Sequence, residues 1–214
     1  MSVIVPTVMA ETIDQLKASV DRLTPFAKRV HYDLTDGEFA PTILLDPSSL
    51  YWTEGWEVDI HMMYARPSER LAEIVVLRPS MIILHAEADE DIVPQLNLIK
   101  EQGIKAGVAL LKTTVPSSVE EAIRTADHVM IFSGDLGKFG GKASMMQLEK
   151  IRLIKKINPT AEIGWDGGVN PENAYSLSQG GVDVLNVGGV IAEAKDPAAT
   201  YASMVKEINK HGVI

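Results

Sequence analysis

Residues 30–37 read V-H-Y-D-L-T-D-G, an apolar run in which a histidine and an aspartate stand two positions apart. Side chains alternate between the two faces of a β-strand, so His31 and Asp33 share one face and Tyr32 takes the other. The run is one of eight that are rich in β-branched or apolar residues. These candidate strands are Val3–Val5, Val30–Leu34, Glu57–Met62, Met81–His85, Lys105–Leu110, His128–Phe132, Ala161–Trp165 and Asp183–Val187.

Amphipathic stretches lie between the candidate strands. Thr12–Leu23 and Ser144–Ile157 both carry apolar residues at helical spacing, and the first opens on a threonine that can cap a helix. One helix per strand predicts a parallel sheet, either closed into a barrel or open and doubly wound. An open dinucleotide-binding sheet needs G-x-G-x-x-G after its first strand, and residues 5–11 contain no glycine. Eight strands without a linker-like tract therefore predict an α/β fold, a single (β/α)8 TIM-barrel domain over residues 1–214.

The composition limits the function classes. Hydrophobic residues make up 46% and charged residues 23% of the chain, as in ordinary soluble globular proteins. The net charge of −9 argues against nucleic acid or an anionic membrane as the main partner, and no apolar run approaches the roughly 18 residues of a membrane-spanning helix. The chain has no cysteine, which excludes disulfides and thiolate catalysis. Because the N-terminus does not read as a secretory signal, we expect a cytoplasmic protein.

Polar side chains stand toward the ends of three candidate strands. The second strand carries His31 and Asp33, the third carries His61, and the seventh runs into Asp166. Such groups are costly inside a packed barrel unless they find partners. Taken singly, each histidine fits a hydrogen-bonded core residue. Together, at the barrel end that carries chemistry, the four predict one divalent metal site for Zn, Mn, Fe or Co. His85 fits either support behind a metal ligand or simple packing.

Three glycine pairs follow the last three strands. A glycine pair alone indicates only a turn, but TIM barrels often bind phosphate on backbone N–H groups after strands seven and eight. Lys138 and Lys142 flank the first pair and are candidates to close over the anion. The three pairs, which together predict a phosphate site, are Gly140-Gly141, Gly167-Gly168 and Gly188-Gly189.

Several motifs resemble those of the ribulose-phosphate 3-epimerase family, nearly from end to end. H-Y-D-L-T-D-G at residues 31–37 resembles the family's H-x-D-x-M-D-G, and D-I-H-M-M at 59–63 resembles D-x-H-L-M. H-A-E at 85–87, G-V-A-L at 107–110 and D-G-G-V-N at 166–170 match, and F-G-G at 139–141 resembles the core of G-F-G-G-Q. V-P-T-V-M-A-E at 5–11 loosely resembles the opening P-S-I-L-S-A-D, which places Thr7 at the family's first serine.

The resemblance implies a fold, a cofactor and a reaction. One divalent ion, Zn first and Fe, Mn or Co as alternatives, is held by His31, Asp33, His61 and Asp166. Asp33 and Asp166 also act as acid and base, and invert C3 of D-ribulose 5-phosphate to give D-xylulose 5-phosphate through an enediolate. Thr7 and the glycine pairs hold this sugar phosphate of the pentose phosphate pathway. We further expect a homo-oligomer.

The departures from the family pattern lie around the substrate. Thr35 replaces a methionine, Lys138 stands where glycine is expected, and Gly189 replaces a serine whose hydroxyl would help to hold phosphate. These changes leave open an epimerase for another ketose phosphate, such as allulose 6-phosphate, or a metal-binding barrel without turnover. A decarboxylase or hexulose-phosphate synthase is disfavoured, because the chain lacks their D-x-K-x-x-D constellation.

Overall fold

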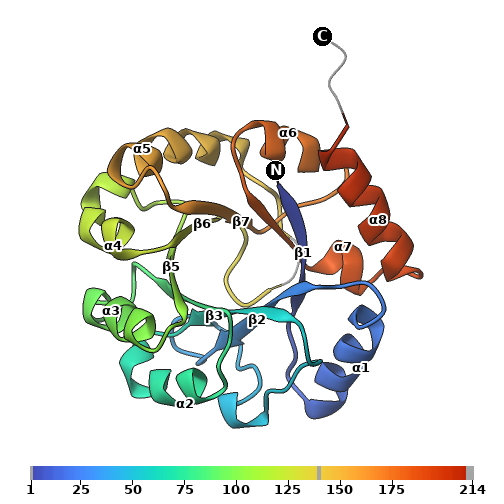
Figure 1. Ribbon diagram of the computed structural model, residues 1–214, viewed down its shortest axis with the longest axis horizontal. Helices are drawn as coiled ribbons and strands as arrows, with labels where there is room; N and C mark the ends of the chain where they lie inside the picture. Colours follow the sequence, from blue (N-terminus) through green and yellow to red (C-terminus); the bar gives the residue numbers. More distant parts are fainter. Residues whose placement is uncertain (1, 139–140, 211–214) are drawn as a thin grey trace.

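Eight parallel strands close into one barrel in chain order, and the helices form a ring around it (Figure 1). The computed structural model describes residues 2–138 and 141–210. The predicted (β/α)8 barrel is confirmed. Its strands are β1 (Val3–Val8), β2 (Arg29–Thr35), β3 (Glu57–Met63), β4 (Met81–His85), β5 (Lys105–Leu110), β6 (His128–Phe132), β7 (Glu162–Asp166) and β8 (Val184–Val187).

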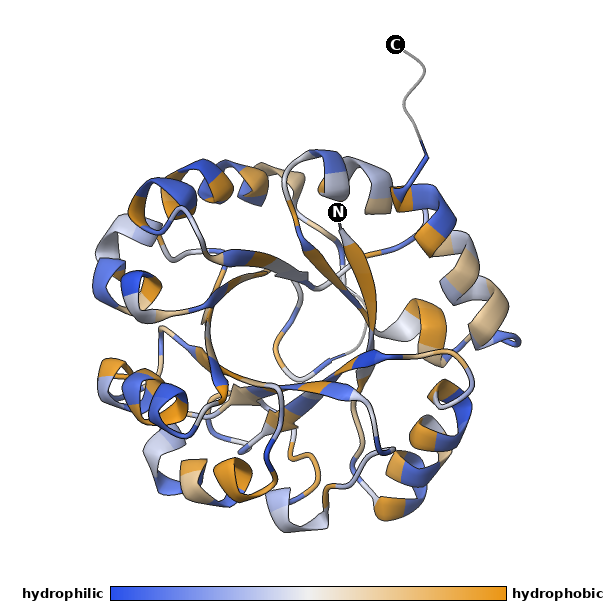
Figure 2. Cartoon of the chain, viewed as in Figure 1, coloured by the Kyte–Doolittle hydropathy of each residue, from blue (hydrophilic) through white to orange (hydrophobic). Residues whose placement is uncertain are grey.

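The helices pack on the outside of the barrel. Figure 2 shows hydrophobic and hydrophilic residues striped along them, as expected for helices with one buried face. They are α1 (Ile13–Leu23), α2 (Leu71–Val76), α3 (Val93–Glu101), α4 (Glu120–Thr125), α5 (Glu149–Ile157), α6 (Ala174–Gln179), α7 (Gly189–Ala192) and α8 (Pro197–Ile208). The described part of the chain also forms 3-10 turns, which are η1 (Pro47–Ser49), η2 (Pro67–Glu69), η3 (Pro116–Ser118) and η4 (Met145–Leu148).

Most predicted boundaries fall within two residues of the observed ones. The strand predicted at Val3–Val5 is longer, because β1 continues to Val8 and pairs with both β2 and β8. The helix predicted over residues 144–157 is two elements, the turn η4 and then α5. The Ser133 hydroxyl, in the loop after β6, accepts a hydrogen bond from the Ser144 N–H at 2.7 Å. This bond holds the start of the segment against the barrel.

Two apolar cores flank the sheet. The larger fills the space between barrel and helices and includes Trp165 and Leu16. The smaller lies inside the barrel and consists of Met81, Ile83, Ala109, Met130 and Phe132. Because side chains alternate along each strand, the remaining inward positions carry polar groups near both ends of the barrel.

A charged cluster closes the amino-terminal end of the barrel. Arg29 donates from Nε to Asp59 Oδ2 at 2.7 Å and from its two Nη atoms to both oxygens of Glu162 at 3.0 and 2.9 Å. His128 Nδ1 lies 2.8 Å from Glu162 Oε2. Burial opposes ionisation of Glu162, but the bonds from His128 and Arg29 outweigh it and lower its pKa. Asp59 and Glu162 are therefore both paired with Arg29.

None of the helices in residues 2–138 and 141–210 is both long and apolar enough to cross a membrane.

Candidate metal centre

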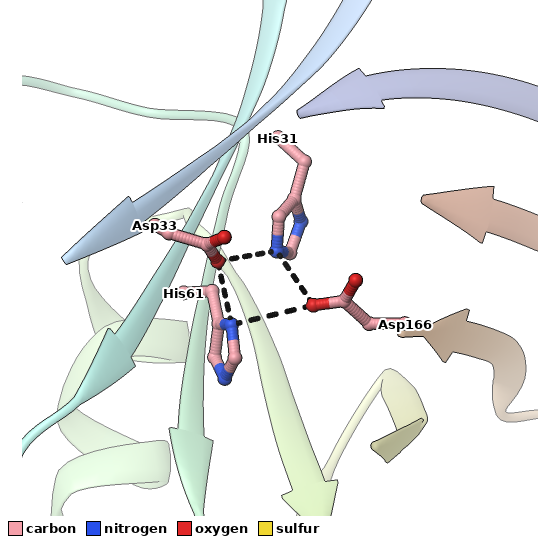
Figure 3. Close-up of side chains that lie close together, drawn as sticks. All are labelled: His31, Asp33, His61 and Asp166. Carbon is pink, nitrogen blue, oxygen red and sulfur yellow. Dashed lines mark hydrogen bonds and ion pairs between the residues drawn. The ribbon is translucent and has the colours of Figure 1, made fainter. Parts of the chain in front are cut away.

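The residues predicted as metal ligands converge at the carboxyl end of the barrel. His31 and Asp33 come from β2, His61 from β3 and Asp166 from the end of β7. One candidate ligand atom from each lies within 4.8 Å of all the others (Figure 3). His61 Nδ1 is 2.9 Å from Asp33 Oδ1 and 3.8 Å from Asp166 Oδ2. His31 Nε2 is 3.3 Å and 3.8 Å from the same two oxygens.

The register of β2 and β3 explains this convergence. Asp33 pairs with His61 across the two strands, and inward-facing positions recur at every second residue. Tyr32, between the two β2 ligands, points outward as predicted, where its hydroxyl donates to the Tyr51 carbonyl at 3.1 Å. The V-H-Y-D-L pattern therefore places one aromatic ring under the helices and two candidate ligands inside the barrel.

Burial and mutual charge move the pKa values of the two aspartates in opposite directions. For Asp33, burial opposes ionisation, but the adjacent imidazoles of His31 and His61 lower its pKa well below the usual range. For Asp166, burial and then the charge of Asp33 raise the pKa to about 6. For His31, burial favours the neutral form, yet the neighbouring carboxylates raise its pKa. The cluster thus has one strongly acidic and one weakly acidic carboxyl group.

The donor set suits a divalent cation. Both ring nitrogens of His31 are buried and have no hydrogen-bond partner among the described residues. Buried polar atoms are normally satisfied, so such a pair calls for an explanation. Two imidazoles and two carboxylates around one point are a common ligand set for Zn and related metals. The residues present therefore fit the predicted ion.

A pocket opens directly above the cluster. Its lining includes Asp33 and Asp166 together with four residues predicted to bind substrate, which are Thr7, Gly167, Gly168 and Gly188. Thr7 Oγ1 is buried without a hydrogen-bond partner in the described chain. Lys138 also lines the pocket, beside Asp135 and Gly137. Gly189 follows Gly188 and begins α7.

Only one glycine of the first predicted pair, Gly140-Gly141, lies within the described residues. Gly140 lies outside the described residues, and Gly141 has a φ of +82° and sits beside Gly134. Gly167 and Gly168 also have positive φ, and each has a second constraint. A Cβ on Gly167 would meet Gly134 N at 2.0 Å, and one on Gly168 would meet Ala143 N at 2.2 Å. These two glycines are therefore required by close packing against the β6 loop, whatever they bind.

His85 lies behind His61 and contacts it. The two Nε2 atoms are 2.8 Å apart, and His85 Nδ1 is 3.2 Å from Glu87 Oε2. Glu87 Oε1 accepts from the Leu111 N–H at 2.9 Å and also from the Thr114 hydroxyl. Burial, with the nearby charge of His61, lowers the pKa of His85 to about 4, so its ring is neutral at pH 7. His85 is thus part of a continuous polar chain.

Asn186 is a pocket residue that the sequence reasoning missed. It lies on β8, is 2% exposed and lines the same pocket. Its Nδ2 contacts Met130 Sδ at 3.3 Å, while Oδ1 has no partner in the described chain. The signal was present in the sequence, because an asparagine stands two positions before Gly188 in an otherwise apolar strand. Alternation alone places both residues inside the barrel.

The fold and the cluster together define the class of protein: a (β/α)8 barrel with a candidate metal centre and a pocket at the carboxyl end of its strands. The model of the Ribulose-phosphate 3 epimerase family matches residues 3–192. The chain belongs to this family and is an enzyme of the isomerase class.

Individual relatives agree with the family match. The chain is 34% identical to the ribulose-phosphate 3-epimerase of Aquifex aeolicus over 174 residues, which are 78% of each protein. It is 30% identical to that of Helicobacter pylori strain J99 over 200 residues, 90% of this chain and 92% of the relative. A crystal structure of 3-hexulose-6-phosphate synthase superposes with a TM-score of 0.67 and covers 97% of this chain and 100% of that one. At 13% identity this last likeness shows the fold alone.

Proposed function

We propose that the chain converts D-ribulose 5-phosphate to D-xylulose 5-phosphate by inverting C3, with Asp33 and Asp166 as the proton-transfer groups. The observation that carries this proposal is the placement of these two carboxylates. Figure 3 shows them on opposite sides of the cluster, with the imidazoles of His31 and His61 between them. Both line the pocket. Epimerisation needs two such groups, because one proton leaves one face of the carbon and another arrives on the opposite face.

The proposed ion is held by His31, Asp33, His61 and Asp166, with Zn²⁺ as the first choice and Fe, Mn or Co as alternatives. When bound, it supplies positive charge beside the oxygens that become negative when C3 loses its proton. The carboxylates of Asp33 and Asp166 bring negative charge into this buried site. These two carboxylates offset the positive charge of a divalent ion, so the site favours a bound cation over a bound anion.

The two aspartates differ in the way that proton transfer requires. Asp33 has a lowered pKa, so it is ionised and able to accept a proton at any physiological pH. Asp166, with a pKa of about 6, gains and loses a proton close to neutrality. A pair of carboxyl groups with separated pKa values is the usual arrangement for paired acid and base roles. Asp33 and Asp166 exchange these roles when the reaction runs in the opposite direction.

The phosphate of the substrate is proposed to bind at the other side of the pocket, on N–H groups near Gly167, Gly168, Gly188 and Gly189. Thr7, whose hydroxyl is buried and unpartnered, is proposed to donate to a sugar oxygen. Anchoring the remote end of the sugar holds C3 between the two carboxylates and so lowers the entropic cost of reaction. Gly140 and Gly141 stay in the prediction as further parts of this phosphate site.

An epimerase for another ketose phosphate, such as allulose 6-phosphate, is the second candidate. Lys138 and Asn186 favour it, because both line the pocket and both put a polar group close to the sugar. A longer ketose needs additional hydrogen-bonding groups of this kind. The metal, the two aspartates and the chemistry at C3 are the same in both candidates.

One experiment tests both candidates. The purified enzyme is stripped of metal with a chelator, reloaded with Zn²⁺, Mn²⁺, Fe²⁺ or Co²⁺ in turn, and assayed with D-ribulose 5-phosphate, D-allulose 6-phosphate and D-ribulose. We expect activity only in the reloaded enzyme, only on phosphorylated sugars, and highest on ribulose 5-phosphate. Faster turnover of allulose 6-phosphate would favour the second candidate. Equal turnover of D-ribulose would contradict the phosphate site.

A further inference from the structure

A chain of hydrogen bonds runs outward from the candidate metal centre through β4. His61 faces the cluster with Nδ1 and faces His85 with Nε2, and His85 in turn faces Glu87 with its Nδ1. The distances along this path are 2.9 Å to Asp33, 2.8 Å between the imidazoles and 3.2 Å to the Glu87 carboxylate. The side chains of His61 and His85 are both fully buried.

Glu87 sets the direction of the two hydrogen bonds that join His61 to His85 and His85 to Glu87. An ionised carboxylate only accepts hydrogen bonds, so His85 Nδ1 must carry its proton toward Glu87. A neutral imidazole has one N–H, which leaves a bare lone pair on His85 Nε2. The contact between the two rings is then a hydrogen bond only if His61 Nε2 donates. With its proton on Nε2, a neutral His61 turns an unprotonated Nδ1 toward Asp33 and Asp166.

We propose that Glu87 is a positioning residue for metal binding: through His85 it fixes the tautomer of His61, so that Nδ1 presents a lone pair to the cation. The proposal goes beyond the proposed function, which assigns no role to His85 or Glu87, and rests on it for the presence of a metal. Partners of this kind, which orient a histidine ligand by holding its second nitrogen, tune metal affinity in other sites.

The surroundings keep Glu87 and His85 in place. The Leu111 N–H and the Thr114 hydroxyl both donate to Glu87 Oε1, which leaves Oε2 for His85. The ring of His85 lies 4.7 Å from that of Phe39 and 5.6 Å from that of Phe132. A histidine that served only as packing would not need a carboxylate held in this orientation by two further donors.

The substitution Glu87→Gln tests the direction of the chain with almost no change of shape. The amide oxygen of glutamine takes the Oε1 position, because Leu111 and Thr114 both donate there. The amide nitrogen then faces His85 Nδ1 and donates to it, which reverses each bond. His85 Nε2 now carries the proton, His61 Nε2 accepts it, and His61 Nδ1 turns an N–H toward the cation site. Glutamine, which has almost the same volume as glutamate, therefore opposes metal binding by His61.

Two measurements are made on wild type, Glu87→Gln and the control Glu101→Gln, which removes the same charge from the exposed end of α3. Nitrogen-15 NMR of histidine-labelled, metal-free protein reports which nitrogen of His85 carries the proton. Titration with Co²⁺ and with Zn²⁺ against a competing chelator gives the metal affinity, and the visible spectrum of bound Co²⁺ reports its coordination. We expect Glu87→Gln to move the His85 proton from Nδ1 to Nε2 and to lower the affinity for both metals by about 10- to 100-fold. The control should change neither reading.

The proposal is overturned if His85 in the wild type carries its proton on Nε2, or if Glu87→Gln binds Co²⁺ as tightly as wild type and with the same spectrum. A weaker affinity without a change of tautomer also overturns it, because lost charge then explains the effect. Thr114→Val, which keeps the carboxylate, provides a second variant if Glu87→Gln does not fold, and we expect a smaller loss of affinity. If the wild type binds no metal, the proposed function fails, while the NMR reading of His85 still decides the direction of the chain.

Discussion

The two ends of the barrel each hold a cluster of histidine and aspartate or glutamate, but among the residues that the structure describes only the amino-terminal cluster includes an arginine. At the amino-terminal end, Arg29 bonds to Asp59 and to both oxygens of Glu162. At the carboxyl end, no arginine or lysine forms an ion pair with Asp33 or Asp166 within residues 2–138 and 141–210. In the first cluster both carboxylates are paired with a cation of the chain itself. The second has the composition of a binding site.

Buried charge explains why this difference matters. Taking a carboxylate out of water costs several kcal/mol unless a partner of opposite charge compensates. Arg29 is that partner at one end, where it compensates the charge of both Asp59 and Glu162. At the other end the compensation must come from protonated imidazoles or from a bound cation. The same residue types therefore stabilise the fold at one end and bind and react at the other.

The largest expected effect is the loss of activity when an aspartate of the carboxyl-end cluster is replaced. Asp33→Asn or Asp166→Asn keeps an oxygen that can bind metal but removes a group that transfers protons. We expect epimerisation to slow by about 10²- to 10⁴-fold in each variant, as is typical for loss of a general acid or base. Exchange of the C3 proton with deuterated solvent, measured from both substrates, identifies the half-reaction that fails. Asp21→Asn on exposed α1 is the matched control. Activity close to wild type in both site variants would contradict the assignment.

The amino-terminal end should respond in stability and not in chemistry. Arg29→Met leaves Asp59 and Glu162 without their cation, and breaking such a buried pair costs about 3–5 kcal/mol. We expect the low end of that range because the Glu162 side chain is 33% exposed. Denaturant unfolding measures the loss, and the activity of the folded fraction should stay near that of wild type. Arg66→Met removes exposed ion pairs with Glu38 and Glu69, and we expect it to change the free energy of unfolding much less than Arg29→Met does.

The two ends should also respond to pH with opposite sign in metal-free protein. Glu162 has a lowered pKa, so the stability it adds is present above the pKa of the unfolded state and is lost as the pH falls through the folded value. Asp166 has a raised pKa of about 6, so its contribution is favourable when protonated and is lost as the pH rises toward 6.

Thermal melting of chelator-treated protein between pH 2 and 7 separates these contributions, because that of Glu162 is lost below the ordinary pKa of a glutamate and that of Asp166 is lost as the pH rises through about 6. Asp166→Asn should remove the loss of stability that the wild type shows as the pH rises toward 6. Glu162→Gln should remove the loss of stability that the wild type shows at low pH. If the melting temperatures of both variants change with pH as that of the wild type does, neither Asp166 nor Glu162 has a shifted pKa. Metal affinity of the wild type should also decline below about pH 6, because a proton then competes for Asp166.

The sequence predicted the barrel and the convergence of the four candidate ligands because both depend on local alternation. Eight apolar runs defined the strands, and the position of His31 and Asp33 two residues apart placed both inside. Asn186 follows the same rule, but a single asparagine in an apolar strand carries no chemical motif and was missed. The packing role of Gly167 and Gly168 was not predictable in this way. It depends on the approach of the β6 loop, which is distant in sequence and close only in the folded chain.

The smallest expected effect concerns Lys138, which directly precedes the F-G-G motif at residues 139–141. This side chain is exposed and lines the pocket beside the proposed phosphate site. An exposed charge attracts an anion only weakly and is screened by salt. Lys138→Met should therefore raise KM for ribulose 5-phosphate by a few-fold at low ionic strength, with kcat unchanged, and the difference should vanish near 0.5 M salt, where the screening length is only several Å. Lys17→Met, on the exposed face of α1, is the control for net charge. If Lys138 instead contacts the sugar, the loss will persist at high salt and will differ between ribulose 5-phosphate and allulose 6-phosphate, which would favour the second candidate substrate.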